Sequence, residues 1–181
     1  MFKGCTNLTA APALPATTLA ENCYYSMFYG CTNLNAAPEL SATTLAKSCC
    51  SDMFRNCTSL TAAPELLAET LAESCYAFMF NGCSNLNYIK VHFTAWGSGR
   101  TAQWVKGVSA TGTFYCPSGL PNTSGTSNIP TDWTKVNLEL RKARAEAQAK
   151  ERRGEVREAC LSRFLCGAGC RDVACYVSKC Q

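Results

Sequence analysis

The chain has 181 residues, of which 47% are hydrophobic, 17% are charged and 14 are cysteines, and its formal net charge is +4. The hydrophobic content excludes a wholly disordered chain, and no stretch approaches the roughly 20 consecutive apolar residues that a membrane-spanning helix needs. Residues 1–134 hold six Lys or Arg against seven Asp or Glu, whereas residues 135–181 hold eleven against six, so the body is near neutral and the tail is basic.

Four copies of one short motif follow one another at equal intervals. They begin at Met1, Met27, Met53 and Met79, and they share the pattern Met-Phe-x-Gly/Asn-Cys-Thr/Ser-Asn/Ser-Leu. A fixed 26-residue period is typical of a solenoid, in which each repeat buries its apolar face against the next. The pattern therefore favours a binding scaffold over an enzyme.

The start of the chain falls within this pattern. Met1 occupies the first position of a repeat, and the N-terminal residues contain no basic segment followed by an apolar run. We therefore expect the chain as given to be truncated at its N-terminus, without a signal peptide and without a polar capping repeat.

Each repeat is predicted to contain one strand and one short helix. Residues 5–15 are expected to be extended, because two prolines disfavour a helix there. Residues 16–24 are expected to form a short helical turn with one buried edge, since Leu19, Cys23 and Met27 recur at every fourth position. One strand plus one short helix in each 26-residue repeat is the leucine-rich-repeat plan.

Residues at equivalent repeat positions are expected to form ladders through a common core. The phenylalanine ladder is interpreted as core rather than as an aromatic binding stripe. Two cysteine ladders are interpreted as small buried hydrophobic residues with free thiols, although disulfides within or between them stay geometrically possible. The members are Phe2, Phe28, Phe54 and Phe80; Cys5, Cys31, Cys57 and Cys83; and Cys23, Cys49 and Cys75.

Positions that differ between copies are the candidate partner-binding surface. A change that leaves the repeat intact implies exposure, and exposed variable positions on a rigid scaffold are where repeat proteins recognise partners. Simple drift of a solvated face explains the same variation equally well. The candidate residues are Lys3, Tyr29, Arg55, Asn81, Glu39, Glu65 and Tyr25.

The pattern changes after residue 86. Strands are predicted at residues 88–94 and 112–117, and a brief helix is predicted at residues 101–108. A loop rich in Gly, Ser, Asn and Pro follows from residue 118 to residue 130. We expect residues 87–136 to form a β-rich C-terminal capping module that closes the end of the repeats at residues 1–86.

The repeat motif, its Ala-Pro-x-Leu strand and its Thr-Leu-Ala-x-x-Cys-Tyr turn resemble bacterial leucine-rich repeats of the BspA type. Residues 88–133 look like the end module that often accompanies such arrays in gut bacteria and their phages. The resemblance covers about residues 1–136. It implies an extracellular or surface-exposed binding solenoid that is often linked to adhesion or host interaction, although this chain has no signal peptide.

Residues 137–181 form a basic, Cys-rich tail that the 26-residue period does not explain. Residues 138–153 are rich in Ala, Glu, Lys and Arg and predict an exposed helix. The remainder contains Cys160, Cys166, Cys170, Cys175 and Cys180 without a Cys-x-x-Cys pair or a nearby histidine, so a local disulfide cluster or an unstructured extension is favoured over a zinc site.

No catalytic, cofactor-binding or metal-binding residues are predicted. The single histidine, His92, is interpreted as an exposed strand residue, and no paired-carboxylate or phosphate-binding pattern occurs. The predicted function is a non-catalytic scaffold that binds a protein or glycan on a host or bacterial surface. Two alternatives stay open: a phage or prophage structural or receptor-binding component, and a tail that binds nucleic acid or zinc. Nucleic acid is the less favoured partner, because the tail's basic residues are mixed with acids and aromatic residues are scarce.

Overall fold

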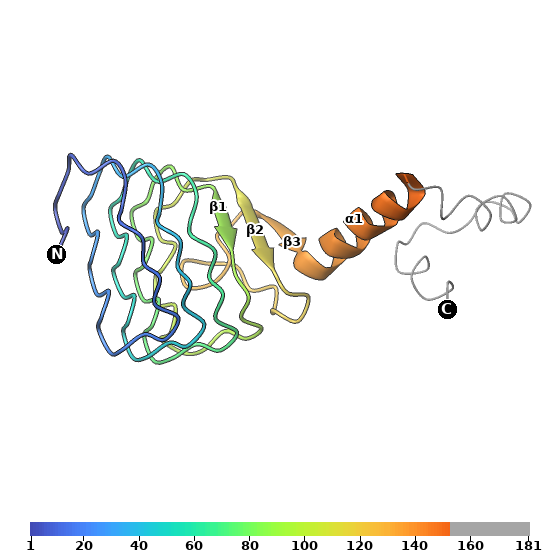
Figure 1. The fold of residues 1–181 in the computed structure, drawn as a ribbon, viewed down its shortest axis with the longest axis horizontal. Helices are drawn as coiled ribbons and strands as arrows, with labels where there is room; N and C mark the ends of the chain where they lie inside the picture. Colours follow the sequence, from blue (N-terminus) through green and yellow to red (C-terminus); the bar gives the residue numbers. More distant parts are fainter. Residues whose placement is uncertain (153–181) are drawn as a thin grey trace, which may run out of the picture. The chain divides into compact units, whose positions relative to one another are not determined.

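The computed structural model describes residues 1–152. The chain divides into a first unit, Met1–Arg141, and a second unit, Lys142–Gln181. Regular secondary structure in the described residues comprises β1 (Tyr88–Lys90), β2 (Thr113–Cys116), β3 (Thr134–Asn137) and α1 (Leu138–Arg152). The strands form one parallel sheet in the order β1-β2-β3 (Figure 1). In its register, Tyr88 lies opposite Thr113 and Phe114 lies opposite Lys135.

The predicted fold class, a leucine-rich-repeat solenoid with one strand and one short helix in each 26-residue repeat, is wrong. The regular structure of residues 1–152 is a small, open three-stranded sheet and one helix, and all four elements lie after residue 87. Residues 1–86 contain turns and isolated parallel bridges, such as Ala10 with Ala36 and Leu14 with Leu40, instead of repeated strands and helices.

Backbone hydrogen bonds explain why the predicted helical turns do not form. In the turn segment that follows each extended stretch, the N–H groups alternate between two kinds of acceptor. Tyr24 N donates to Cys49 O in the next copy at 2.8 Å, whereas Met27 N donates to Tyr24 O, three positions back, at 3.1 Å. An α-helix requires every N–H to reach the carbonyl four positions back, so this alternation excludes it.

The backbone torsion angles of the turn segments show the same departure from a helix. Asn22, Ser26 and Gly30 have φ angles of 56°, 51° and 71°, and the equivalent residues of the next two copies also have positive φ. A right-handed helix has φ near −63°, so a left-handed residue at every fourth position interrupts it repeatedly. The buried edge of Leu19 and Met27 therefore arises from these turns and not from a helix.

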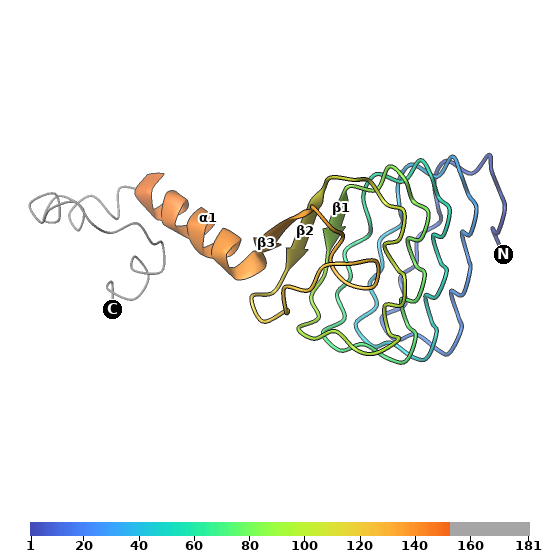
Figure 2. The same cartoon turned by 180° about the vertical axis from the view of Figure 1, so that it is seen from behind.

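Successive copies of the motif lie side by side, as both views show (Figures 1 and 2), and backbone hydrogen bonds join them. In all three pairs of neighbouring copies, the N–H of the motif's phenylalanine donates to the carbonyl of the methionine that begins the next copy. Phe2 N donates to Met27 O at 3.0 Å, and Phe28 N donates to Met53 O at 2.9 Å. The phenylalanines also stack in parallel, with ring centroids 5.5 Å apart for Phe2 and Phe28.

The core residues follow the predicted ladders. The rings of Phe28, Phe54 and Phe80 have no exposed surface, which confirms that the phenylalanine ladder is core. All nine cysteines in the described residues are free, and the members of the two ladders are buried except at the first copy, where Cys5 is exposed and Cys23 is half-buried. The buried thiols also act as donors, because Cys57 Sγ lies 3.1 Å from Phe28 O and Cys83 Sγ lies 3.0 Å from Phe54 O.

Aromatic side chains continue the core beyond the fourth copy. Trp104 is fully buried, with its ring centroid 6.0 Å from that of Phe80 and 6.2 Å from that of Phe114 on β2. The brief helix predicted at residues 101–108 does not form. This segment has turns instead, with Gln103 in the left-handed region at φ 47°, and it accepts backbone hydrogen bonds from the fourth copy.

The exposed helix predicted at residues 138–153 is present as α1. Asn137 caps its N-terminus, because Asn137 Oδ1 accepts hydrogen bonds from Glu139 N at 2.9 Å and from Leu140 N at 3.2 Å. The tail cysteines from Cys160 to Cys180, and with them the predicted disulfide and zinc alternatives, lie outside the described residues.

Candidate functional site

Three of the candidate residues lie together in one row, which we call the cation–aromatic stripe and define as Lys3, Tyr29, Arg55 and Phe78. Lys3 Nζ lies 4.9 Å from the centroid of the Tyr29 ring, and Arg55 Cζ lies 5.7 Å from the same centroid. Arg55 Cζ also lies 5.3 Å from the centroid of Phe78. Cations and aromatic rings therefore alternate along the stripe at distances that allow cation–π attraction.

The hydrogen bonds between copies explain this alignment. Lys3, Tyr29 and Arg55 each follow the phenylalanine of their copy, and the bonds that join neighbouring copies fix these phenylalanines side by side. The side chains that follow them must then also lie next to one another, one from each copy. The alignment of Lys3, Tyr29 and Arg55 is thus a direct product of the 26-residue period, whereas Phe78 comes from a different repeat position.

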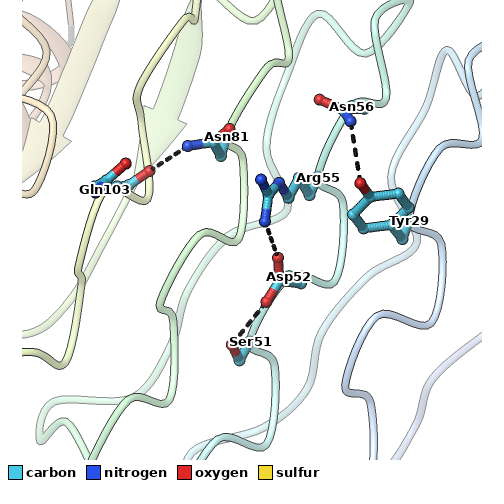
Figure 3. Close-up of polar contacts among 7 residues, drawn as sticks. All are labelled: Tyr29, Ser51, Asp52, Arg55, Asn56, Asn81 and Gln103. Carbon is cyan, nitrogen blue, oxygen red and sulfur yellow. Dashed lines mark hydrogen bonds and ion pairs between the residues drawn. The ribbon is translucent and has the colours of Figure 1, made fainter.

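A buried carboxylate holds Arg55 in place. Asp52 is 8% exposed, and its Oδ1 lies 2.9 Å from Arg55 Nη1 in an ion pair, while its Oδ2 accepts a hydrogen bond from Ser51 Oγ at 3.2 Å (Figure 3). Arg55 Nε is buried without a hydrogen-bond partner in the described residues. Fixing the guanidinium in this way reduces the conformational entropy that Arg55 would lose on contacting a ligand.

The neighbouring asparagines make weaker contacts. Asn56 Nδ2 donates to the hydroxyl oxygen of Tyr29 at 3.5 Å, and Asn81 Nδ2 donates to Gln103 O at 3.2 Å (Figure 3). Asn81, although it shares the repeat position of Arg55, therefore fastens the fourth copy to the following segment and makes no ring contact in the stripe.

Glu39 and Glu65 belong to a different surface, a shallow hollow of about 220 Å³ that we call the acidic hollow. Two prolines, Pro38 and Pro64, and Leu67 contribute to its lining. The two glutamates occupy the same repeat position in successive copies, and both are exposed. Glu39 makes no ion pair or side-chain hydrogen bond within residues 1–152, so its charge is available to a ligand.

Glu65 is already engaged with two basic side chains. Its Oε1 lies 2.7 Å from Lys90 Nζ and 2.6 Å from His92 Nε2. Burial alone would raise the pKa of Glu65, but the hydrogen bonds and charges of Lys90 and His92 outweigh it, and the pKa lies below its ordinary value. His92 thus contacts Glu65 near the hollow; it is half-buried and lies after the end of β1, whereas the sequence predicts an exposed strand residue.

Tyr25 stands apart from both surfaces. It is 55% exposed, and none of its side-chain atoms makes a hydrogen bond or ring contact with the stripe or the hollow. The structure therefore brings together Lys3, Tyr29 and Arg55, and separately Glu39 and Glu65, whereas Asn81 and Tyr25 join neither set.

Asp52 and Phe78 complete the stripe. The comparison of copies that identifies Tyr25 also marks both as variable, because Tyr25-Ser26, Ser51-Asp52 and Ala77-Phe78 occupy the same repeat positions, but it does not predict their contacts with Arg55. A charged column also runs through Glu21, Lys47 and Glu73, in which Lys47 Nζ lies 2.9 Å from Glu73 Oε1. The sequence could have predicted this column, because an acid, a base and an acid occupy the same position of successive repeats.

Neither a metal site nor a membrane-spanning helix is found in the described part of the chain. Within residues 1–152, no three His, Cys, Asp or Glu side chains lie close enough to hold a metal ion. No helix in the same residues has the length and apolar character needed to cross a membrane.

Comparisons with known proteins give no relative: no family model, no curated protein and no solved structure matches the chain. The resemblance of its repeats to those of the BspA type therefore stays a prediction.

Proposed function

We propose that this protein is a non-catalytic binding scaffold that recognises a protein or glycan on a host or bacterial surface. The observation that carries the proposal is the gathering of Lys3, Tyr29 and Arg55 in one stripe. These residues differ between copies, whereas the adjoining Phe and Cys positions are the same in all four copies. Accessible positions that vary while the core positions stay the same are what a recognition surface requires.

The composition of the stripe supports this proposal. Tyrosine and arginine are the residue types most enriched among energetically dominant contacts in interfaces, because both offer large, partly apolar area together with polar groups. Tyr29 is half-buried, and Arg55 is held by Asp52. A ligand that covers the stripe would therefore meet side chains that are already ordered.

The acidic hollow supports the same function with a different chemistry. Glu39 offers a carboxylate that has no ion pair within residues 1–152, beside Pro38 and Leu40 in the lining of the hollow, which suits a basic or hydroxyl-bearing group of a ligand. The proposed location at a cell surface or outside the cell rests on the resemblance of the repeats alone.

The test measures binding of the whole chain to immobilised surface-protein extracts and to a glycan array. Tyr29→Ala and Lys3→Ala should each weaken the strongest binding signal about tenfold. Glu69→Ala is the matched control, because Glu69 is also exposed but belongs to neither surface. If both stripe variants bind as the unchanged protein does, or if Glu69→Ala weakens binding equally, the stripe is not the recognition surface.

A further inference from the structure

The repeat position that supplies most of the stripe alternates between charged and uncharged hydrogen-bond donors. Its occupants in the four copies are Lys3, Tyr29, Arg55 and Asn81, in that order. Lys3 and Arg55 are cations, whereas Tyr29 offers a hydroxyl group and Asn81 offers an amide. Each of the four side chains can therefore donate hydrogen bonds, and every second one also carries a positive charge. We call these four residues the donor row.

The donor row faces solvent along the side of the copies and not at their end. Arg55 lies in an interior copy, because the phenylalanine before it stacks between the rings of the second and fourth copies. Its side chain is nevertheless 36% exposed. Tyr29 is half-buried, and Figure 3 shows Tyr29, Arg55 and Asn81 following one another through successive copies. A ligand can therefore lie across several copies at once.

Donor groups in the row are left without acceptors. Arg55 Nη1 donates to Asp52 at 2.9 Å, whereas Arg55 Nη2 makes no hydrogen bond within residues 1–152. Lys3 Nζ makes no ion pair in the same residues. The hydroxyl oxygen of Tyr29 accepts a hydrogen bond from Asn56 at 3.5 Å, so the hydroxyl hydrogen is left for another acceptor. Since two of these donors are cations, anionic oxygens are the acceptors that suit them best.

On the basis of the binding function proposed above, we propose that the donor row binds a linear glycan in which acidic sugars alternate with neutral sugars. Carboxylates of the acidic sugars pair with Lys3 and Arg55, and the neutral sugar between them accepts the hydrogen bond of the Tyr29 hydroxyl group. Lys3 and Arg55 come from the copies on either side of Tyr29 and cover its ring faces. The sugar therefore meets the hydroxyl end of Tyr29 and does not stack on its ring.

The spacing of the copies favours a glycan over an acidic peptide. The stacked phenylalanine rings set neighbouring copies 5.5–5.8 Å apart. One sugar unit in an extended β-linked chain has a similar length, so successive sugars meet successive copies. In an extended peptide, side chains on one face are about 6.7 Å apart, so its carboxylates lose register with the row. A polymer with a charge on every unit would also place a carboxylate opposite the uncharged Tyr29.

The test compares three β-linked hexasaccharides in isothermal titration calorimetry with the full chain. Hyaluronan carries a carboxylate on alternate sugars, oligomannuronate carries one on every sugar, and chitohexaose carries none. We expect saturable one-to-one binding of the hyaluronan hexasaccharide, about tenfold tighter than that of either other sugar. The affinity for hyaluronan should decrease as the salt concentration rises, because added salt screens the exposed cations.

Four variants assign the binding to the donor row. Lys3→Gln should weaken hyaluronan binding about tenfold, whereas Lys3→Arg keeps the charge and should stay within about threefold. Tyr29→Phe keeps the ring but loses the hydroxyl donor, so it should weaken binding about fivefold. Lys47→Gln is the matched control. It removes the same charge from the column of Glu21 and Glu73 and should leave the affinity within about threefold.

Four outcomes would overturn the proposal. An absence of saturable hyaluronan binding is the first, and equal affinity for chitohexaose is the second. Equal or tighter binding of oligomannuronate is the third, because the alternation of charge would then not be recognised. Tighter binding of poly-L-glutamate is the fourth, because the occupant would then be an acidic polypeptide.

The proposed binding function is judged separately from its glycan. If hyaluronan does not bind but Tyr29→Ala still weakens binding to the surface-protein extract, the scaffold function stands and only the ligand class is wrong. If Tyr29→Ala changes neither measurement, both proposals fail.

Discussion

Truncating one phenylalanine of the ladder tests whether this column holds the copies together. Phe54 is fully buried between the rings of Phe28 and Phe80, at centroid distances of 5.5 and 5.8 Å. Phe54→Ala removes a buried ring and leaves a cavity, for which the expected loss is about 3–5 kcal/mol of the free energy of unfolding. Phe2→Ala removes a half-buried ring with one stacked neighbour, so the expected loss is about 1–2 kcal/mol.

Native-state hydrogen exchange measured by mass spectrometry suits this comparison, because it reports the free energy of opening for separate segments. An array of similar copies need not unfold in one step, so a single denaturation midpoint would average over them. Phe54→Ala should increase exchange in residues 28–86, whereas Phe2→Ala should affect mainly the first copy. If the two substitutions lower the opening free energies by amounts within about 0.5 kcal/mol of each other, the burial argument is wrong.

Three further predictions concern single positions. Gly82→Ala should lower the free energy of unfolding by about 2 kcal/mol or more, because Gly82 has a φ of +77° and an added Cβ would overlap Asn56 Oδ1. In urea unfolding, the double variant that also carries Asn56→Gly should recover part of this loss. The folded-state pKa of Glu65 lies below its ordinary value of 4.5, so its contribution to stability is present above that pH and is lost as the pH falls through the folded pKa; Glu65→Gln should flatten this part of the stability profile. Burial raises the pKa of Cys57 to about 12, so at pH 8 iodoacetamide should alkylate the exposed Cys5 but not Cys57, as peptide mapping would show.

The sequence predicted which side chains are buried more accurately than it predicted the conformation of the backbone. Equivalent positions such as Phe28 and Phe54 are core because the period brings them together, and this inference does not depend on the secondary structure. The prediction of a helical turn was wrong, because apolar residues at every fourth position are compatible with two different backbone conformations. A helix places them on one face, and so does a chain with a left-handed residue at every fourth position. Ser26 and Phe78, with φ angles of 51° and 55°, carry no sequence signal for that conformation.

The candidate site was predictable to a similar extent. Differences between copies identified Lys3, Tyr29 and Arg55, and the period explains why they lie in one row. The ion pair of Arg55 with Asp52 depends on the turn between them, in which Asp52 has a φ of 56°, so the wrong helical backbone could not predict it. The separation of the stripe from the acidic hollow likewise depends on where the chain turns.

One repeat position shows why recognition can vary without loss of the fold. Position 29 and its equivalents in the two following copies carry Tyr, Arg and Asn, yet Tyr29 N, Arg55 N and Asn81 N all donate to the carbonyl three positions back, at 3.2, 3.1 and 3.1 Å. The backbone at this position is therefore insensitive to the side chain. The stabilising contacts come from the adjacent phenylalanine, whose ring is buried, so substitutions at the stripe can change the chemistry offered to a ligand while the core column stays intact.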